Sequence, residues 1–258
     1  SSMLNSCGFF YSPTYDITHS RQRQSKIDMS KPIWERIDRR FFWNSHFMEK
    51  FIEHSITDWI LPVMDGHLEI HRCNSRLGPY SFVLISRREC YRTGARFHTR
   101  GADPAGHCAN FAETEQMVIC NGNVSSWVQT RGSIPLIWFQ PRSINPTKAK
   151  PTVDYSPFSV CLILYTNTFL DTKRLQRQAF RKHIETQVET YGRHLLVSLI
   201  DQKGNEQEVG ESFETKVKLL TRQDVKYLAF DFHEECKNNN YARLDLLVDM
   251  VKEILTAN

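Results

Sequence analysis

The stretch NFAETEQMVICNGNVSSWVQTR, residues 110–131, holds two β-rich runs on either side of Asn121 and Gly122. An Asn-Gly pair between two such runs favours a tight hairpin turn, because both residues tolerate a positive φ. Similar short runs, separated by turn residues, fill residues 59–140. We therefore expect a mostly antiparallel sheet in this part of the chain.

The second half has a different periodicity. Two apolar runs, RHLLVSLID (193–201) and VKYLAFDF (225–232), alternate with helical patterns. The helices are expected at about 171–191, 206–220 and 241–255. Near-continuous apolar strands joined by a helix favour buried parallel pairing. The predicted fold class is α/β, or mixed α+β. It is a mixed sheet flanked by helices, with a β-rich first half and an α/β second half.

Two segments near the start have patterns of their own. FFYSPTYDIT (9–18) alternates like a strand that a proline interrupts. Apolar residues spaced by three and four over residues 33–53 predict a helix that starts near Ser30 and Pro32. Farther on, residues 141–165 change from Pro-rich and basic to strongly apolar. They predict either a surface loop with a core strand or an insertion.

Composition excludes several classes of protein. The 258 residues are 40% hydrophobic and 24% charged, as in an ordinary globular domain rather than a disordered chain. No apolar run reaches the roughly 20 residues of a membrane-spanning helix. A net charge of +4 permits an anionic partner, whereas nucleic-acid binding would leave a stronger basic signature. Seven irregularly spaced cysteines without C-x-x-C favour reduced cytosolic thiols, with no disulfide framework or structural zinc.

The densest polar region is Ser86–Gln116, where arginines and glycines precede Glu113 and Glu115. Its arginines are Arg87, Arg88, Arg92, Arg96 and Arg100. Clustered arginines suit bidentate recognition of phosphate. The alternative is a solvated hairpin whose arginines pair with the glutamates. In both cases we expect a loop outside the core.

Two shorter motifs carry polar side chains at the ends of predicted strands. Arg131 and Ser133 flank Gly132 and either present a guanidinium and backbone N–H groups to an anion or form a tight turn. In FDFHE, Asp231 and His233 alternate, so a strand would point both to one face. They form either an acid/base or phosphate-contacting pair, or a hydrogen bond that ends the strand.

The cysteines include one formal match to the C-x5-R loop of cysteine-dependent phosphatases, in which a thiolate attacks phosphorus. Only Cys90 has an arginine, Arg96, six residues later. No apolar strand runs directly into Cys90, and no helical pattern follows Arg96. We therefore interpret this match as fortuitous.

Taken together, the motifs resemble the Sac-domain phosphoinositide phosphatases. The similar pieces, in the order of that family, are FFYSPTYDITHSRQRQ (9–24), DRRFFWN (38–44), LISRRECYRTGARFHTRGADPAGHCANFAETEQ (84–116), SWVQTRGSIPLIW (126–138) and FDFHEEC (230–236). The long R-x-x-x-R-G-x-D-x-x-G-x-x-A-N-F-x-E-T-E-Q string is the most specific of them. Within this family, the sequence at residues 20–25, 32–44 and 227–236 is most similar to the endosomal inositol polyphosphate 5-phosphatase F type.

The resemblance implies the front part of a Sac catalytic domain. Residues 1–30 would be a remnant of the N-terminal subdomain, and residues 31–258 a partial catalytic domain with a possible insertion at 159–178. The full-length parent would remove a monoester phosphate, the 4-phosphate, from the inositol ring of a phosphoinositide through a phosphocysteine, without metal or other cofactor. Such a protein would act peripherally on the cytosolic face of endosomal or other endomembranes.

The resemblance also assigns site residues. Arg131, Ser133, Asp231 and His233 would line the headgroup site, with Arg100 and Asn110 in a second rank. The catalytic C-x5-R loop of the family follows the FDFH strand at a distance that this chain does not reach, so we expect the chain alone to be inactive. The alternatives are a non-catalytic protein that binds a phosphoinositide or a protein partner through the basic loop Arg87–Arg100, and a fragment that does not fold stably.

Overall fold

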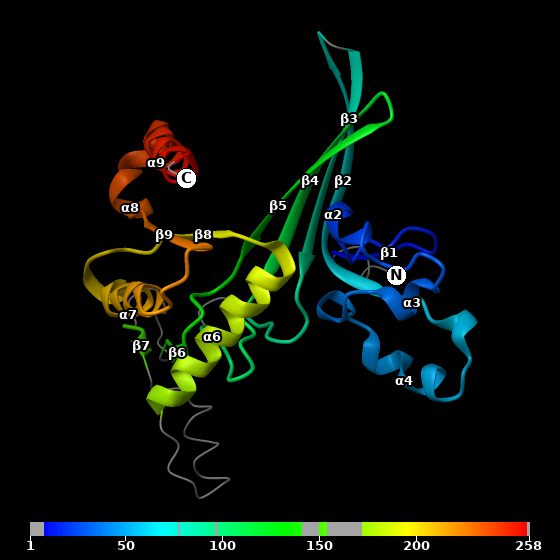
Figure 1. Cartoon of the computed structure of the whole chain (residues 1–258), viewed down its shortest axis with the longest axis horizontal. Coiled ribbons are helices and arrows are strands. Elements are labelled where there is room, and N and C mark those ends of the chain that lie inside the picture. The colour runs from blue at the N-terminus through cyan, green and yellow to red at the C-terminus, as the bar shows by residue number, and fades with distance from the viewer. Residues whose placement is uncertain (1–7, 77, 96–97, 141–149, 154–171, 257–258) are drawn as a thin grey trace, which may run out of the picture. The chain divides into compact units, whose positions relative to one another are not determined.

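The computed structural model describes residues 8–76, 78–95, 98–140, 150–153 and 172–256. The chain divides into two compact units. Unit 1 holds residues 1–93 and 110–132, and unit 2 holds residues 94–109 and 133–258. Figure 1 labels the elements of both units. The two sequence-based domains, 1–30 and 31–258, stay a prediction.

Unit 1 is built on a five-stranded sheet in the order β1-β2-β3-β4-β5, with antiparallel pairing throughout. Its strands are β1 (Phe9–Tyr11), β2 (Val63–Ser75), β3 (Gly78–Arg88), β4 (Ala112–Cys120) and β5 (Asn123–Arg131). The predicted hairpin is confirmed, because Asn121 (φ 49°) and Gly122 (φ 78°) turn the chain between β4 and β5. Figure 1 shows β2 to β5 as a long twisted ribbon.

The buried apolar residues of unit 1 form two clusters, and the larger one includes residues of β2, β3 and β4. The larger cluster comprises Ile17, Phe41, Met64, Val83, Ile85, Phe111 and Met117. The unit also contains short helical segments: α2 (Arg21–Gln24), α3 (Ile33–Arg36), η1 (Arg39–Phe41), α4 (Ser45–Glu53) and η2 (Thr57–Trp59). The strand predicted at 9–18 ends at Tyr11, before Pro13.

The continuous helix expected over residues 33–53 is wrong. Ile37 is extended (ψ 152°), so α3 ends after one turn. Asp38 then caps the 3-10 turn η1 by accepting a hydrogen bond from the N–H of Arg40. Beyond this break, Phe41 and Phe42 are both fully buried, Phe41 in the cluster with strand residues and Phe42 in a second cluster with Ile37 and Ile60.

Unit 2 contains the α/β half of the fold. The parallel pair β8 (His194–Ser198) and β9 (Val225–Ala229) is joined through η4 (Gly204–Glu206) and α7 (Gln207–Lys218), as the apolar runs predicted. The unit also has α6 (Thr172–Tyr191), α8 (Phe232–Glu235), η5 (Lys237–Asn239), η6 (Tyr241–Arg243) and α9 (Leu244–Thr256). A short antiparallel pair joins β6 (Trp138–Phe139) to β7 (Thr152–Val153).

Helices α6 and α7 bury their apolar stripes in the core of unit 2. That core comprises Leu136, Trp138, Phe180, Ile184, Val209, Phe213, Val217 and Val225. The helix expected at about 171–191 is confirmed as α6, and Gln176 in its first half bonds both backbone groups of Ile137. Residues 159–171 of the predicted insertion lie outside the described residues, so the insertion stays a prediction. The mixed α/β fold class is confirmed.

Candidate functional site

Two of the sequence motifs meet within unit 2. The N–H of Gly101 donates to Oγ of Ser133 at 2.9 Å, and the N–H of Ala102 donates to the carbonyl of Leu136. Gly101 has a φ of +68°, and a Cβ there would lie 2.6 Å from the Leu136 carbonyl oxygen. The R-G of the long motif therefore needs glycine so that its backbone can lie against the segment that follows R-G-S.

Arg100 lies over an aromatic ring in this same part of unit 2. Its guanidinium carbon is 5.5 Å from the centroid of Trp138, within the range of a cation–π contact. Ser133 is half-buried, and its N–H bonds the carbonyl of Ala109. The structure thus brings Arg100 and Ser133, two of the six predicted site residues, to neighbouring positions through Gly101.

The other two candidates of unit 2 lie at the carboxyl ends of the parallel strands. The expectation that Asp231 and His233 alternate on a strand is wrong, because β9 ends at Ala229 and Phe232 begins α8. Asp231 is the N-cap of this short helix and accepts from the N–H of Glu234 at 3.0 Å. Its other oxygen accepts from the N–H of Gln202, in the segment that follows β8, at 2.9 Å.

His233 also bonds the segment after β8. Its Nδ1 lies 2.6 Å from Oδ1 of Asp201, and this hydrogen bond and ion pair raise the pKa of the imidazole. Asp201 and Gln202 are the site residues that the sequence missed. The signal was available, since both directly follow the apolar run of β8 as Asp231 follows that of β9. The end of a strand in an α/β fold is where ligand-contacting residues gather.

Arg131 and Asn110 belong to unit 1. Arg131 is the exposed last residue of β5, opposite Ala112 of β4. Asn110 has a positive φ of 53°, and its Oδ1 accepts from the guanidinium of Arg88 at 3.0 Å. This contact with Arg88 holds Asn110 in place just before β4 begins at Ala112.

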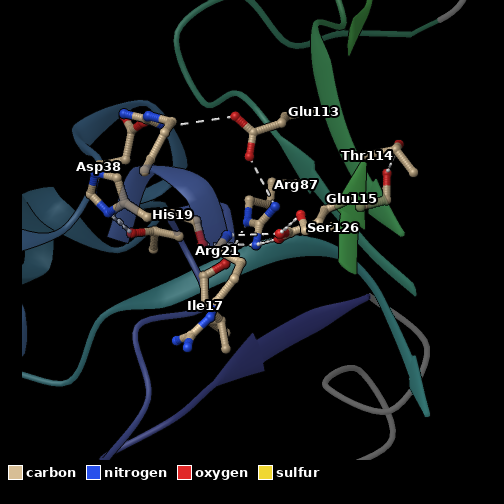
Figure 2. A network of polar contacts seen from close by, with 12 residues as sticks. Ile17, His19, Arg21, Asp38, Arg87, Glu113, Thr114, Glu115 and Ser126 are labelled. Atoms are coloured by element: carbon tan, nitrogen blue, oxygen red, sulfur yellow. Dashed lines mark hydrogen bonds and ion pairs between the residues drawn. The ribbon is translucent and has the colours of Figure 1, made fainter. Parts of the chain in front are cut away.

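The expectation of a polar loop at residues 86–116 is wrong at both ends. Strand β3 continues through Arg88 and β4 starts at Ala112, so Arg87, Glu113 and Glu115 are sheet residues with no exposed surface. Figure 2 shows the guanidinium of Arg87 bonded to both glutamates, at 2.9 Å to Glu113 and 2.7 Å to Glu115. Arg87 also donates to the carbonyls of Ile17 and His19. All of these contacts engage the guanidinium inside the protein, which removes Arg87 from any phosphate-binding loop.

The buried polar network around Arg87 also includes two carboxylates of the N-terminal segment, Asp38 and Asp16. Asp38 pairs with Arg23 at 2.6 Å and with Arg40 at 2.7 Å. Burial alone would raise the pKa of Asp38, but the hydrogen bonds and charges of the two arginines outweigh it and hold that pKa well below its usual range. Burial is likewise outweighed at Asp16, whose pKa is lowered by hydrogen bonds from His19 and Thr18. The network therefore has the features of a buried framework in which each ion has a partner.

Cys90 has the surroundings of a structural thiol. Burial, followed by the negative charges of Glu89 and Asp38, raises its pKa. Its N–H bonds the carbonyl of Arg40. A nucleophilic cysteine needs a lowered pKa and electropositive neighbours, so these properties oppose that role. Arg96, its formal partner in the C-x5-R pattern, lies outside the described residues.

The described part of the chain contains neither a membrane-spanning helix nor a cluster of metal ligands. None of its helices has the length and apolar character that crossing a bilayer requires. Among the same residues, no three His, Cys, Asp or Glu side chains gather in a way that could hold a metal ion.

Comparison with known proteins identifies the family. The profile described as SacI homology domain matches residues 1–237. The chain is 36% identical over 257 residues to the zebrafish protein named phosphatidylinositol-3-phosphatase SAC1-B, covering 98% of this chain and 41% of that protein. It is 34% identical to the yeast phosphatidylinositol-3-phosphatase SAC1, with coverage of 99% and 39%.

Relatives named SAC2, rather than SAC1, match as well. The human phosphatidylinositide phosphatase SAC2 is 31% identical over 287 residues, which cover 98% of this chain and 23% of that protein. The chain thus spans about two fifths or less of the length of these relatives. Assignment to the 5-phosphatase F type stays a prediction, because relatives of both names match. By the match along most of its length, the chain belongs to the SacI homology domain family.

Proposed function

We propose that the full-length protein of which this chain forms a part hydrolyses a monoester phosphate, the 4-phosphate, from the inositol ring of a phosphoinositide. The reaction would pass through a phosphocysteine on a C-x5-R loop. The observation that carries this proposal is the alignment of 98–99% of the chain with proteins named as phosphoinositide phosphatases. The raised pKa of Cys90 supports a nucleophile elsewhere.

The proposed headgroup contacts come from four residues. Arg131 and Ser133 flank Gly132, so a guanidinium and a hydroxyl are available within one short segment. Asp231 and His233 follow the carboxyl end of β9 and bond the segment after β8, and the carboxyl ends of strands are the usual location of ligands in α/β folds. Arg100 and Asn110 would support these contacts, Arg100 beside Ser133 and Asn110 through Arg88.

The protein would meet its substrate at the cytosolic face of endosomal or other endomembranes. The phosphoinositide headgroup is then its main partner, and the net charge of +4 is compatible with an anionic surface. An epitope-tagged full-length protein followed by fractionation and microscopy tests this placement. Recovery in a secreted or luminal fraction would contradict it.

The test of activity starts from the complete transcript, which shows whether a C-x5-R loop follows residue 258 and whether codons 159–178 are retained. The full-length protein is then assayed with phosphatidylinositol 4-phosphate and 3-phosphate in separate micelles, because two of the relatives are named as 3-phosphatases. Phosphate release from the 4-phosphate with a preference over the 3-phosphate supports the proposal. Preference for the 3-phosphate overturns the proposed specificity, and release from neither overturns the proposed activity.

A substitution then tests the headgroup contacts. Arg131→Ala is expected to lower kcat/KM for the preferred lipid by about 10- to 100-fold, the usual cost of a charged phosphate contact. The matched control is Arg181→Ala, on the exposed surface of α6, where the arginine pairs with Glu185 of the same helix. Equal activity of the two variants would remove Arg131 from the site.

A further inference from the structure

We propose that His233 donates, from its Nε2–H, the proton that the leaving ring oxygen needs, and that Asp201 is the positioning residue that holds the imidazole for this transfer. This inference rests on the proposed function, and it adds a proton donor and a residue to that site.

The geometry orients the imidazole ring. Oδ1 of Asp201 lies 2.6 Å from Nδ1 of His233, so the carboxylate fixes the proton on Nδ1. In a five-membered ring this turns Nε2 away from Asp201, and the His233 side chain is 77% exposed. A carboxylate on one nitrogen and an open second nitrogen are the arrangement of a histidine that exchanges protons with a ligand.

Hydrogen bonds to the backbone hold Asp201 and His233 in position, although Asp201 follows β8 and His233 follows β9. Asp231 accepts one N–H from Gln202 and another from Glu234, so it connects the segment after β8 to the first turn of α8. The N–H of Asp201 also donates to Glu206 at 3.2 Å. Both ends of the Asp201–His233 contact are therefore held by neighbouring hydrogen bonds.

The surrounding charges raise the pKa of the imidazole. Asp201 raises the pKa of His233 most, and Glu206 and Asp231 add to the effect. Asp201 and a protonated His233 form a neutral pair, and Asp231 directs its two oxygens to backbone N–H groups. These charges thus favour the protonated form of His233 at the carboxyl ends of the strands.

The step balances with groups that the proposed mechanism already supplies. As the cysteine sulfur forms its bond to phosphorus, the bond from phosphorus to the ring oxygen breaks and its electron pair goes to that oxygen. The oxygen takes the proton from Nε2, which leaves a neutral imidazole with Nδ1–H on Asp201. Water then attacks the phosphocysteine, sulfur leaves as thiolate, and the proton released by water returns to Nε2.

The experiment compares two substrates of the full-length protein that differ in their need for a proton. The ring alkoxide of phosphatidylinositol 4-phosphate leaves only with a proton, whereas the phenolate of p-nitrophenyl phosphate leaves without one. His233→Gln is expected to lower kcat for the lipid by about 100-fold or more and to change the aryl phosphate much less. Asp201→Asn is expected to lower kcat for the lipid by about 10-fold. It should also move the alkaline limb of the pH profile of this reaction to lower pH, because the pKa of His233 falls without the carboxylate.

The matched controls are His194→Gln and Asp224→Asn, which change the same residue types at the amino ends of β8 and β9. Thermal melting confirms that each variant folds. A similar loss on both substrates shows a structural role and overturns the inference, as does unchanged lipid activity in His233→Gln or an unmoved pH profile in Asp201→Asn. If the unaltered protein hydrolyses the aryl phosphate but no phosphoinositide, the proposed function itself fails.

Discussion

Arg87 and Glu115 are 28 residues apart in the sequence and form a 2.7 Å ion pair with no exposed surface on either side chain. The contact joins adjacent strands of the sheet. The same guanidinium holds the carbonyls of Ile17 and His19, so it also fastens the N-terminal segment to β3. Part of the motif that identifies the family is thus a structural device of unit 1.

Removing this guanidinium should destabilise the fold. Arg87→Met leaves the buried carboxylates Glu113 and Glu115 without their central cation, which costs about 3–5 kcal/mol. Urea unfolding followed by circular dichroism measures the change. The control is Arg181→Ala, whose exposed pair with Glu185 should contribute less than about 0.5 kcal/mol. Similar stabilities of the two variants would contradict the importance of burial.

The carboxylates of the network should make stability fall in acid. Asp38 and Asp16 have a lower pKa in the folded protein than the usual value of about 3.9. The stability that they contribute is therefore complete above that value and is lost as the pH falls through it toward the folded pKa. Urea unfolding from pH 7 to pH 3 should show a decline that begins near pH 5.

Asp38→Asn tests the origin of that decline. The variant should be less stable at pH 7 and should lose less on acidification, because one of the titrating carboxylates is gone. Asp249→Asn, on exposed α9, removes the same charge without touching the network and should retain the full pH dependence. A decline of the same size in both variants would assign the acid sensitivity to other groups.

Gly101 should not accept a side chain. A Cβ at this position would lie 2.6 Å from the Leu136 carbonyl oxygen, whereas one at Gly192 would meet nothing within 4 Å. Both residues have a positive φ, +68° and +85°, so both alanine variants carry the cost of the left-handed backbone, about 1–2 kcal/mol. Gly101→Ala should lose about 1–3 kcal/mol more than Gly192→Ala in the same unfolding measurement, through overpacking. Equal losses of stability in the two variants would show that the backbone at Gly101 can shift away from Leu136.

Cys90 should be a slow nucleophile. Burial and two nearby carboxylates raise its pKa above the ordinary 9.0, so its thiolate is scarce at neutral pH. Alkylation by iodoacetamide, followed by peptide mass spectrometry from pH 6 to pH 10, should be slower at Cys90 than at a model peptide thiol throughout. In the full-length protein, Cys90→Ser should retain phosphatase activity, and its loss would reopen Cys90 as the nucleophile.

Several features of this protein follow from the sequence alone, because short-range patterns specify them. Asn121 and Gly122 predict the β4–β5 turn, since only residues that tolerate positive φ fit a two-residue hairpin. The apolar runs of β8 and β9, with a helical pattern between them, predict the parallel pair. The long motif at residues 96–116 is specific enough to identify the family.

Other features depend on contacts that no local pattern encodes. Periodicity predicted one helix where Ile37 and Asp38 break the chain, because the burial of Phe41 against distant strand residues such as Val83 and Ile85 outweighs helical spacing. The polar composition of residues 86–116 predicted that Arg87 would lie in a loop outside the core. Strand register sets it opposite Glu113 and beside two distant carbonyls, and these partners offset its desolvation.

The candidate site shows the same division. The sequence marked Asp231 and His233 by their place after an apolar run, which is a local signal. Only the tertiary structure decides that α8 begins there and that His233 bonds Asp201, 32 residues away on the segment after the neighbouring strand. Sequence patterns determine which residues end a strand, whereas the pairing of β8 with β9 determines which of those ends meet.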